Sequence, residues 1–155
     1  MPTSSLGPIG HVRQALLVLA ASGLLVGAPA AFAASGASGT GFRMPSKLVT
    51  CAFLPDERPA GLYCGASYIE QGAYDGVGVV HLPLSGKASY AGSGNDIQLR
   101  LGGWTSSGKR EPRPTLAYGS HWQRSGYRCT SRMTGLECKR GSHGFFLSKE
   151  RIRLY

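Results

Sequence analysis

Short runs of apolar and β-favouring residues, separated by turn-forming residues, make up most of the chain after residue 40. Runs of this kind, bounded by Gly, Pro, Asn, Asp or Ser, are typical of β-strands. They predict strands at residues 48–53, 62–69, 77–84, 97–101, 145–148 and 152–155. The run at 77–84 is apolar on both faces apart from His81, so we expect it at the centre of a sheet.

The clearest alternation lies at residues 97–101. Ile97, Leu99 and Leu101 would share one face of a strand, and Gln98 and Arg100 would share the other. A period of two is the pattern of a half-buried strand. No segment after the N-terminal apolar run sustains a helical period, so strands are predicted throughout the domain.

Residues 102–115 are predicted to form a long loop with residues 109–114 at its tip. Pro112 and Pro114 occupy alternate positions there, and proline has no N–H to donate to a strand ladder. The predicted fold class is all-β: a small, disulfide-stapled antiparallel domain, either a compact barrel or a two-layer sheet.

The N-terminal segment has the pattern of a secretory signal peptide. Residues 16–26 are almost wholly apolar, His11 and Arg13 precede them, and Ala31 and Ala33 supply the small residues of a cleavage site. The run is too short for a bilayer-spanning helix, which needs about 20 residues. The predicted organisation is a signal peptide at 1–33, a flexible tether at 34–41 and a single β domain at 42–155, secreted or periplasmic after cleavage near Ala33.

Four cysteines remain after that cleavage: Cys51, Cys64, Cys129 and Cys138. An even number in an exported domain indicates disulfides. Of the three possible pairings, we prefer Cys51 with Cys64 and Cys129 with Cys138, because each pair flanks a turn and short loops close easily. Each bridge would stabilise the domain by about 2 to 3 kcal/mol. Zinc is the alternative use of four cysteines, but no Cys-x-x-Cys spacing occurs and export disfavours reduced thiols.

The second bridge would close a hairpin whose loop is formed by residues 132–135. Gly135 is expected to take a positive φ there, which glycine adopts without steric cost. A bulkier residue at this position should therefore destabilise the domain.

Positive charge is concentrated in the second half of the mature chain. Residues 100–155 carry twelve Lys or Arg against three acids, whereas residues 34–99 carry four against five. A surface of this kind attracts polyanions. Aromatic residues alternate with the basic ones, and such surfaces can stack on bases or sugars. The candidate binding residues are Trp122, Arg124, Arg128, Lys139, Arg140, Arg151 and Arg153.

Catalytic and metal chemistry have weaker support. A nucleophile–base pair would be built most simply from Ser120, Ser142 or Ser148 with His81, His121 or His143, yet no Gly-x-Ser-x-Gly elbow occurs. The spacing of the three histidines predicts no metal site, and no cofactor is expected. The acids, including Asp56 and Glu57, occur in turn-like sequence and are interpreted as solvated turn residues rather than a glycosidase pair.

Several phrases near the C-terminus resemble a known family. They are Gly126-Tyr127-Arg128-Cys129, Gly135-Leu136-Glu137-Cys138 and His143-Gly144-Phe145-Phe146-Leu147-Ser148. Together they resemble the signature of an uncharacterised family of small exported bacterial domains, a domain-of-unknown-function family. Residues 42–51 resemble that family's opening phrase, except that Lys47 and Leu48 replace its usual Gly-Asn. The family usually carries a further cysteine pair, absent here, whose joint loss supports local pairing of the remaining four.

The resemblance implies export, a disulfide-stapled β fold and no assigned catalytic residues. We therefore expect a non-catalytic binding module with a basic C-terminal face. Its expected ligands are an anionic glycopolymer, a lipid headgroup surface or an acidic protein; nucleic acid fits an exported chain less well. The alternative is a small envelope hydrolase that uses Ser142, His121 and His143.

Overall fold

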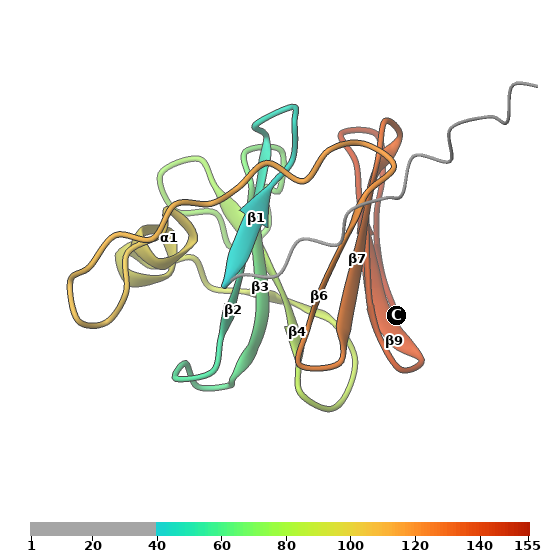
Figure 1. The fold of residues 1–155 in the computed structure, drawn as a ribbon. Coiled ribbons are helices and arrows are strands. Elements are labelled where there is room, and N and C mark those ends of the chain that lie inside the picture. The colour runs from blue at the N-terminus through green and yellow to red at the C-terminus, as the bar shows by residue number, and fades with distance from the viewer. Residues whose placement is uncertain (1–39) are drawn as a thin grey trace, which may run out of the picture. The chain divides into compact units, whose positions relative to one another are not determined.

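The computed structural model describes residues 40–155 (Figure 1). The chain divides into the units Met1–Ala31 and Phe32–Tyr155, and every described residue belongs to the second. The predicted signal peptide, and residues 34–39 of the predicted tether, lie outside the described residues. Within residues 40–155, no helix is long and apolar enough to cross a membrane.

Two five-stranded antiparallel sheets form the domain, and each is a meander in which every strand pairs with its neighbour in sequence. The first sheet contains β1 (Gly41–Arg43), β2 (Val49–Leu54), β3 (Gly61–Ala66), β4 (Gly78–Pro83) and β5 (Ser89–Ala91). The second contains β6 (His121–Arg124), β7 (Tyr127–Arg132), β8 (Gly135–Arg140), β9 (His143–Leu147) and β10 (Ile152–Leu154). The sheets face each other as two layers (Figure 1). The all-β prediction is confirmed in its two-layer form, and the barrel alternative is wrong.

One apolar core lies between the two sheets and draws side chains from both. Ring pairs cross the interface: Phe42 lies 5.3 Å from Trp122 between centroids, and Phe53 lies 5.6 Å from Tyr127. The Tyr127 hydroxyl donates a hydrogen bond of 3.1 Å to the Leu82 carbonyl of the opposite sheet. Burying a hydroxyl group without a hydrogen-bond partner costs free energy, and this bond avoids that cost for Tyr127.

Both disulfides lie in this core and join directly opposite residues of adjacent strands. Cys51 and Cys64 bridge β2 and β3 with Cα atoms 4.1 Å apart, and Cys129 and Cys138 bridge β7 and β8 at 4.0 Å. Such short separations belong to non-hydrogen-bonded cross-strand pairs, where side chains approach most closely. The predicted pairing is confirmed.

Residues 97–101, predicted as a strand, are instead part of α1 (Asn95–Leu101), so this prediction is wrong. Five residues are too few to separate the two periods, because Ile97 and Leu101 also share a helix face at a spacing of four. The structure uses that spacing. Leu101 is buried and Ile97 packs beside it on the outer side of the first sheet, while Leu99 is 49% exposed. Asp96 in the first turn and Arg100 in the last turn suit the helix dipole.

The long loop after α1 is confirmed, but its tip lies earlier than predicted. The chain turns at residues 105–108, where the Thr105 N–H bonds the Lys109 carbonyl. Glu111 and Arg113 have already returned to the first sheet, and the Glu111 N–H donates to the Gly103 carbonyl. The prolines therefore mark the returning strand-like segment rather than the turn.

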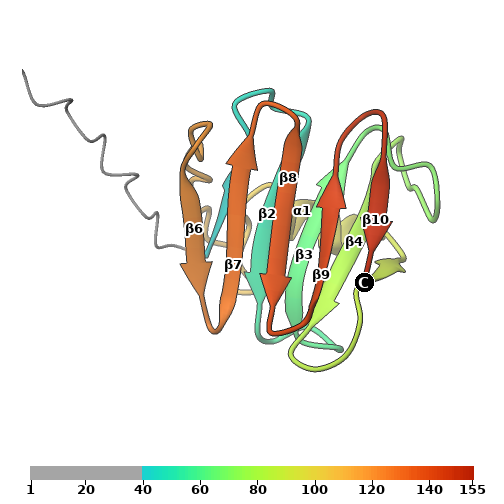
Figure 2. The ribbon, with the colours of Figure 1, turned by 90° about the vertical axis from the view of Figure 1, so that its right-hand side faces the viewer.

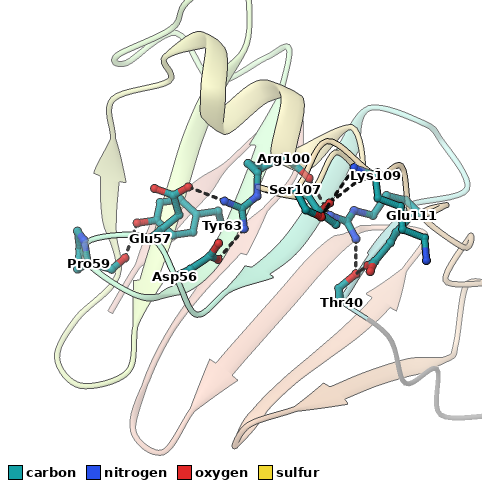
Figure 3. A network of polar contacts seen from close by, with 11 residues as sticks. Thr40, Asp56, Glu57, Pro59, Tyr63, Arg100, Ser107, Lys109 and Glu111 are labelled. Atoms are coloured by element: carbon teal, nitrogen blue, oxygen red, sulfur yellow. Dashed lines mark hydrogen bonds and ion pairs between the residues drawn. The ribbon is translucent and has the colours of Figure 1, made fainter.

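A polar network fastens α1 and this loop to the first sheet (Figure 3). Arg100 pairs with Asp56 at 2.6 Å and Glu57 at 3.1 Å, and its hydrogen bond holds the pKa of Asp56 below its usual value. Arg113 donates to the last carbonyls of α1, at Arg100 and Leu101, and to the Thr40 hydroxyl. Asp56 and Glu57 are thus ion-pair partners of Arg100 rather than simply solvated turn acids.

The β domain begins slightly earlier than the predicted boundary at residue 42. Thr40 donates a hydrogen bond of 2.6 Å to Glu111, and Gly41 is the first residue of β1. A Cβ atom at Gly41 would lie 2.2 Å from the Cys51 carbonyl oxygen, so β1 approaches β2 too closely there for any side chain.

His81 lies on the outer side of the first sheet, where its ring stacks on Tyr63 with centroids 4.3 Å apart. It is only 4% exposed, and its Nε2 has no hydrogen-bond partner among residues 40–155. Burial lowers the pKa of His81 below 6.5, opposed by a backbone hydrogen bond at Ala60. The histidine is therefore held neutral inside the fold.

This burial predicts a loss of stability in mild acid. A histidine whose pKa is lowered on folding binds more protons when unfolded, so its contribution is fully present above pH 6.5 and falls as pH drops below that value. The variant His81→Phe keeps the stacked ring and removes the titration. Urea unfolding from pH 7.5 to pH 5 should show a smaller fall in the free energy of unfolding for the variant than for the parent. Equal falls would contradict this role for His81.

Candidate binding surface on the second sheet

Among the described residues, no element covers the outer face of the second sheet (Figure 2). Charged side chains project from this face. Alternation along β7 produces this arrangement: Tyr127, Cys129 and Ser131 point into the core, whereas Arg128 and Arg132 point outward and are exposed. The first sheet differs, because α1 packs on the outer side of β2 and β3. We call the outward basic side chains of the second sheet and its final turn the basic face: Arg128, Arg132, Lys139, Arg151 and Arg153.

One acid lies in the middle of the basic face and is almost completely engaged. Glu137 pairs with Lys139 at 3.0 Å and with Arg132 at 3.5 Å, and it accepts a hydrogen bond of 3.2 Å from the Tyr155 hydroxyl. Lys139, with smaller contributions from Tyr155 and Arg132, holds the pKa of Glu137 below its usual value. The carboxylate therefore stays ionised, and it neutralises Lys139 and Arg132 in part.

Phe146 lies beside Glu137 in the register of β8 and β9, and Arg153 is its neighbour on β10. Two guanidinium groups contact its ring: the Cζ atoms of Arg151 and Arg153 lie 5.6 and 5.5 Å from the centroid. Cation–π contacts of this length hold a cation beside the ring without neutralising its charge. Within residues 40–155, no acidic side chain forms an ion pair with Arg128, Arg151 or Arg153.

A depression of about 600 Å³ opens on this part of the face. Its lining combines three arginines, one aromatic ring, two hydroxyl groups and two carboxylates. These residues are Arg132, Thr134, Glu137, Phe146, Ser148, Glu150, Arg151 and Arg153. The volume is within the range of small-ligand sites, about 300 to 1,000 Å³.

The structure divides the predicted binding residues into three groups. Arg128, Lys139, Arg151 and Arg153 lie together on the basic face. Trp122 is fully buried against Phe42, so its ring does not lie on the basic face. Its indole ring is part of the core, as the size of a small domain requires.

Arg124 and Arg140 lie off the basic face, although Arg124 is exposed and Arg140 is half-buried. Each follows the inward parity of its strand, and the Cζ of Arg124 lies 5.6 Å from the Phe53 centroid, while that of Arg140 lies 5.4 Å from the Tyr127 centroid. Arg140 also donates to the Ser125 carbonyl at 3.4 Å. Both side chains therefore cover the end of the core between the sheets. Neighbours in sequence, such as Lys139 and Arg140, occupy opposite faces of a strand.

The candidate set missed Arg132, Glu137, Phe146 and Tyr155. The first three point outward from the sheet, as Arg128 does. The alternation of each strand could have predicted this, but only after the turn at Gly135 had fixed the register of β7 against β8. Tyr155 packs over Gly144, where a Cβ atom would lie 3.0 Å from its ring. Nothing in the local sequence indicates that contact, because it depends on which strand pairs with the free edge of β9.

The structure does not bring the proposed hydrolase residues together. His121 lies on the outward side of β6, whereas His143 has the inward parity at the start of β9, with β7 and β8 between them. Among residues 40–155, no hydrogen bond joins a serine hydroxyl to a histidine ring. The same residues contain no group of three His, Cys, Asp or Glu side chains arranged to hold a metal ion.

Part of the chain matches the model of a known family. Residues 98–155 match the model of a family of unknown function, DUF6636. The matched segment runs from the middle of α1 through the long loop to the end of the second sheet, so it contains the whole basic face. No curated protein and no solved structure shows a significant match to the chain.

Proposed function

We propose that the chain is a non-catalytic binding module that takes an anionic ligand on the basic face. The observation that carries the proposal is an uncovered sheet face on which Arg128, Arg151 and Arg153 have no acidic partner among the described residues. A sheet face that only needs to be soluble can interleave charges of both signs. Here the one central acid is already engaged, which leaves a net positive surface.

The spacing of the charges favours a ligand with several anionic groups. Neighbouring strands lie about 4.8 Å apart, so Arg128 on β7 and Arg153 on β10 are separated by roughly 14 Å across the sheet. A single small anion cannot reach both side chains. A chain of anionic groups, such as a charged glycopolymer, a headgroup surface or an acidic protein segment, can contact both at once.

We also propose that the protein acts outside the cytoplasm, in the envelope or beyond it. The two disulfides support this, because such bonds persist in oxidising compartments. The apolar run at residues 16–26 and the small residues up to Ala33 provide the export signal. Intact mass of the secreted protein tests the proposal, since cleavage after Ala33 removes residues 1–33; retention of those residues would contradict it.

Reversing two unpaired charges should weaken polyanion binding strongly. In the variant Arg151→Glu/Arg153→Glu, two attractive charges at the depression become repulsive, and we expect at least a tenfold loss of affinity for immobilised dextran sulfate, about 1.4 kcal/mol. Salt should weaken binding of the parent, because exposed charges are screened beyond about 8 Å at physiological ionic strength. The melting temperature should change little, since both side chains are exposed.

The matched control is Lys109→Glu/Arg110→Glu, which alters net charge by the same amount in the exposed loop after α1. This control should retain most of the affinity. If both double variants lose affinity equally, binding reflects overall charge alone, and the basic face is not a dedicated surface.

A further inference from the structure

The depression on the basic face combines arginines and hydroxyl groups with carboxylates, and a site for a bare anion has no use for the carboxylates. Arg151 and Arg153 line one side, and Thr134 lies on the rest, whereas the Ser148 hydroxyl is buried and bonded to the Arg151 backbone. Glu150 is exposed, lines the same depression and forms no ion pair among the described residues. A free carboxylate lowers the affinity of such a site for any simple anion.

Glu150 is also held as a strong hydrogen-bond acceptor. Its own backbone N–H and the Ser148 hydroxyl lower the pKa of its carboxyl group, so it is ionised at neutral pH. An ionised carboxylate only accepts hydrogen bonds. Its natural partner in a ligand is therefore a hydroxyl or amide donor, and hydrogen bonds to charged groups are among the stronger ones.

The arginine side of the depression is arranged before any ligand arrives. Both guanidinium groups rest against Phe146, which restricts their rotamers. Less side-chain entropy is then lost when an anionic group binds. Glu137 does not compete for these two cations, because Lys139, Arg132 and Tyr155 already occupy its oxygens.

We infer that the depression takes one sugar unit of an anionic polysaccharide, with its acidic group at Arg151 and Arg153 and its hydroxyl groups at Glu150 and Thr134. This inference rests on the proposed function and specifies its ligand. A sugar that bears a sulfate, phosphate or carboxylate supplies an anion and several hydroxyl donors within one ring. Polyphosphate supplies no such donors, and a phosphatidylglycerol surface presents its few hydroxyl groups in a membrane plane.

Replacing Glu150 with alanine separates these ligands, because the change should act in opposite directions on them. The probes are a heparin-derived hexasaccharide and a linear polyphosphate of similar total charge, titrated by calorimetry at equal salt. For the parent, we expect the hexasaccharide to bind at least tenfold more tightly than polyphosphate. Glu150→Ala should weaken hexasaccharide binding about fivefold, through the lost acceptor, and strengthen polyphosphate binding about twofold, through the lost repulsion.

The control Glu70→Ala removes an exposed acid of the first half of the chain and should affect both probes slightly and equally. If Glu150→Ala strengthens both probes, Glu150 is only a repulsive charge and the inference is wrong. Vesicles of phosphatidylglycerol and phosphatidylcholine form a third arm, and binding to them as tight as to the hexasaccharide would also overturn it. In both cases the proposed function stands if Arg151→Glu/Arg153→Glu still abolishes binding. If that variant binds every probe normally, the proposed function itself fails.

Discussion

Replacing Gly135 with valine is expected to lower the free energy of unfolding by about 3 to 5 kcal/mol, near the upper end of single substitutions. Two independent effects contribute. The residue has a φ of +144°, which a β-branched side chain does not tolerate. A Cβ atom would also lie 2.5 Å from the Leu147 carbonyl oxygen and 2.7 Å from the Phe146 ring, so the turn between β7 and β8 and strand β9 would have to separate.

The same collision connects the turn to the binding surface, because Phe146 supports Arg151 and Arg153. Urea denaturation measures the loss in stability, and dextran sulfate retention of the folded fraction measures the effect on the basic face. Gly141→Ala is the control. Gly141 has a φ of +60° in the next hairpin, but a Cβ atom there would meet nothing within 4 Å, so only about 1 to 2 kcal/mol is expected. Equal losses in the two variants would show that the close approach at Gly135 contributes nothing.

Reduction of both disulfides should remove about 5 to 6 kcal/mol of stability. The bridges close loops with sequence separations of 13 and 9 residues, and the chain-entropy relation assigns about 3 kcal/mol to each. Small domains have about 5 to 15 kcal/mol in total, so the reduced protein should be largely unfolded or only marginally folded. The measurement is urea unfolding with and without a phosphine reductant.

Two double variants divide that loss between the bridges. Cys51→Ala/Cys64→Ala and Cys129→Ala/Cys138→Ala should destabilise by similar amounts, because loop length enters only through its logarithm. An unchanged unfolding midpoint after complete reduction would be inconsistent with two core bridges. If only one double variant lowers the free energy of unfolding, the stabilisation comes from the disulfide of that sheet alone.

Much of this fold follows from local patterns in the sequence. Cys129 and Cys138 flank a Gly turn, and β7 alternates cleanly between buried and exposed positions, so the hairpin, its bridge and the turn at Gly135 were predictable. Residues 97–101 were not, because Ile97 and Leu101 satisfy both a strand and a helix within so short a window. The tertiary context, an open outer side of β2 and β3, decides in favour of the helix.

The sequence predicted that the candidate binding surface is basic, but it did not predict correctly which residues lie on it. The excess of Lys and Arg after residue 100 indicated a basic face, and four of the seven candidate residues lie on it. Trp122 and Arg124 lie off that face because strand parity sorts aromatic and basic residues that are mixed in the sequence, and parity requires the register of β6 against β7. The depression depends on the turn at residues 148–151, which is held by hydrogen bonds between Ser148 and Arg151. A periodic sequence pattern does not predict such a turn.

The meander order of the sheets has a consequence for how the chain assembles. Each strand pairs only with a neighbour in sequence, and each covalent bridge stays within its own sheet. Residues 41–91 and 121–154 can therefore form two hairpin stacks independently, each oxidised by collisions between nearby thiols, so mispaired cysteines should be rare. Local pairing of this kind shortens the search that makes most all-β domains slow to fold. The last step of folding is then the docking of the two preformed sheets. In that step Tyr127 and Phe53 come into contact and water is excluded from the space between the sheets.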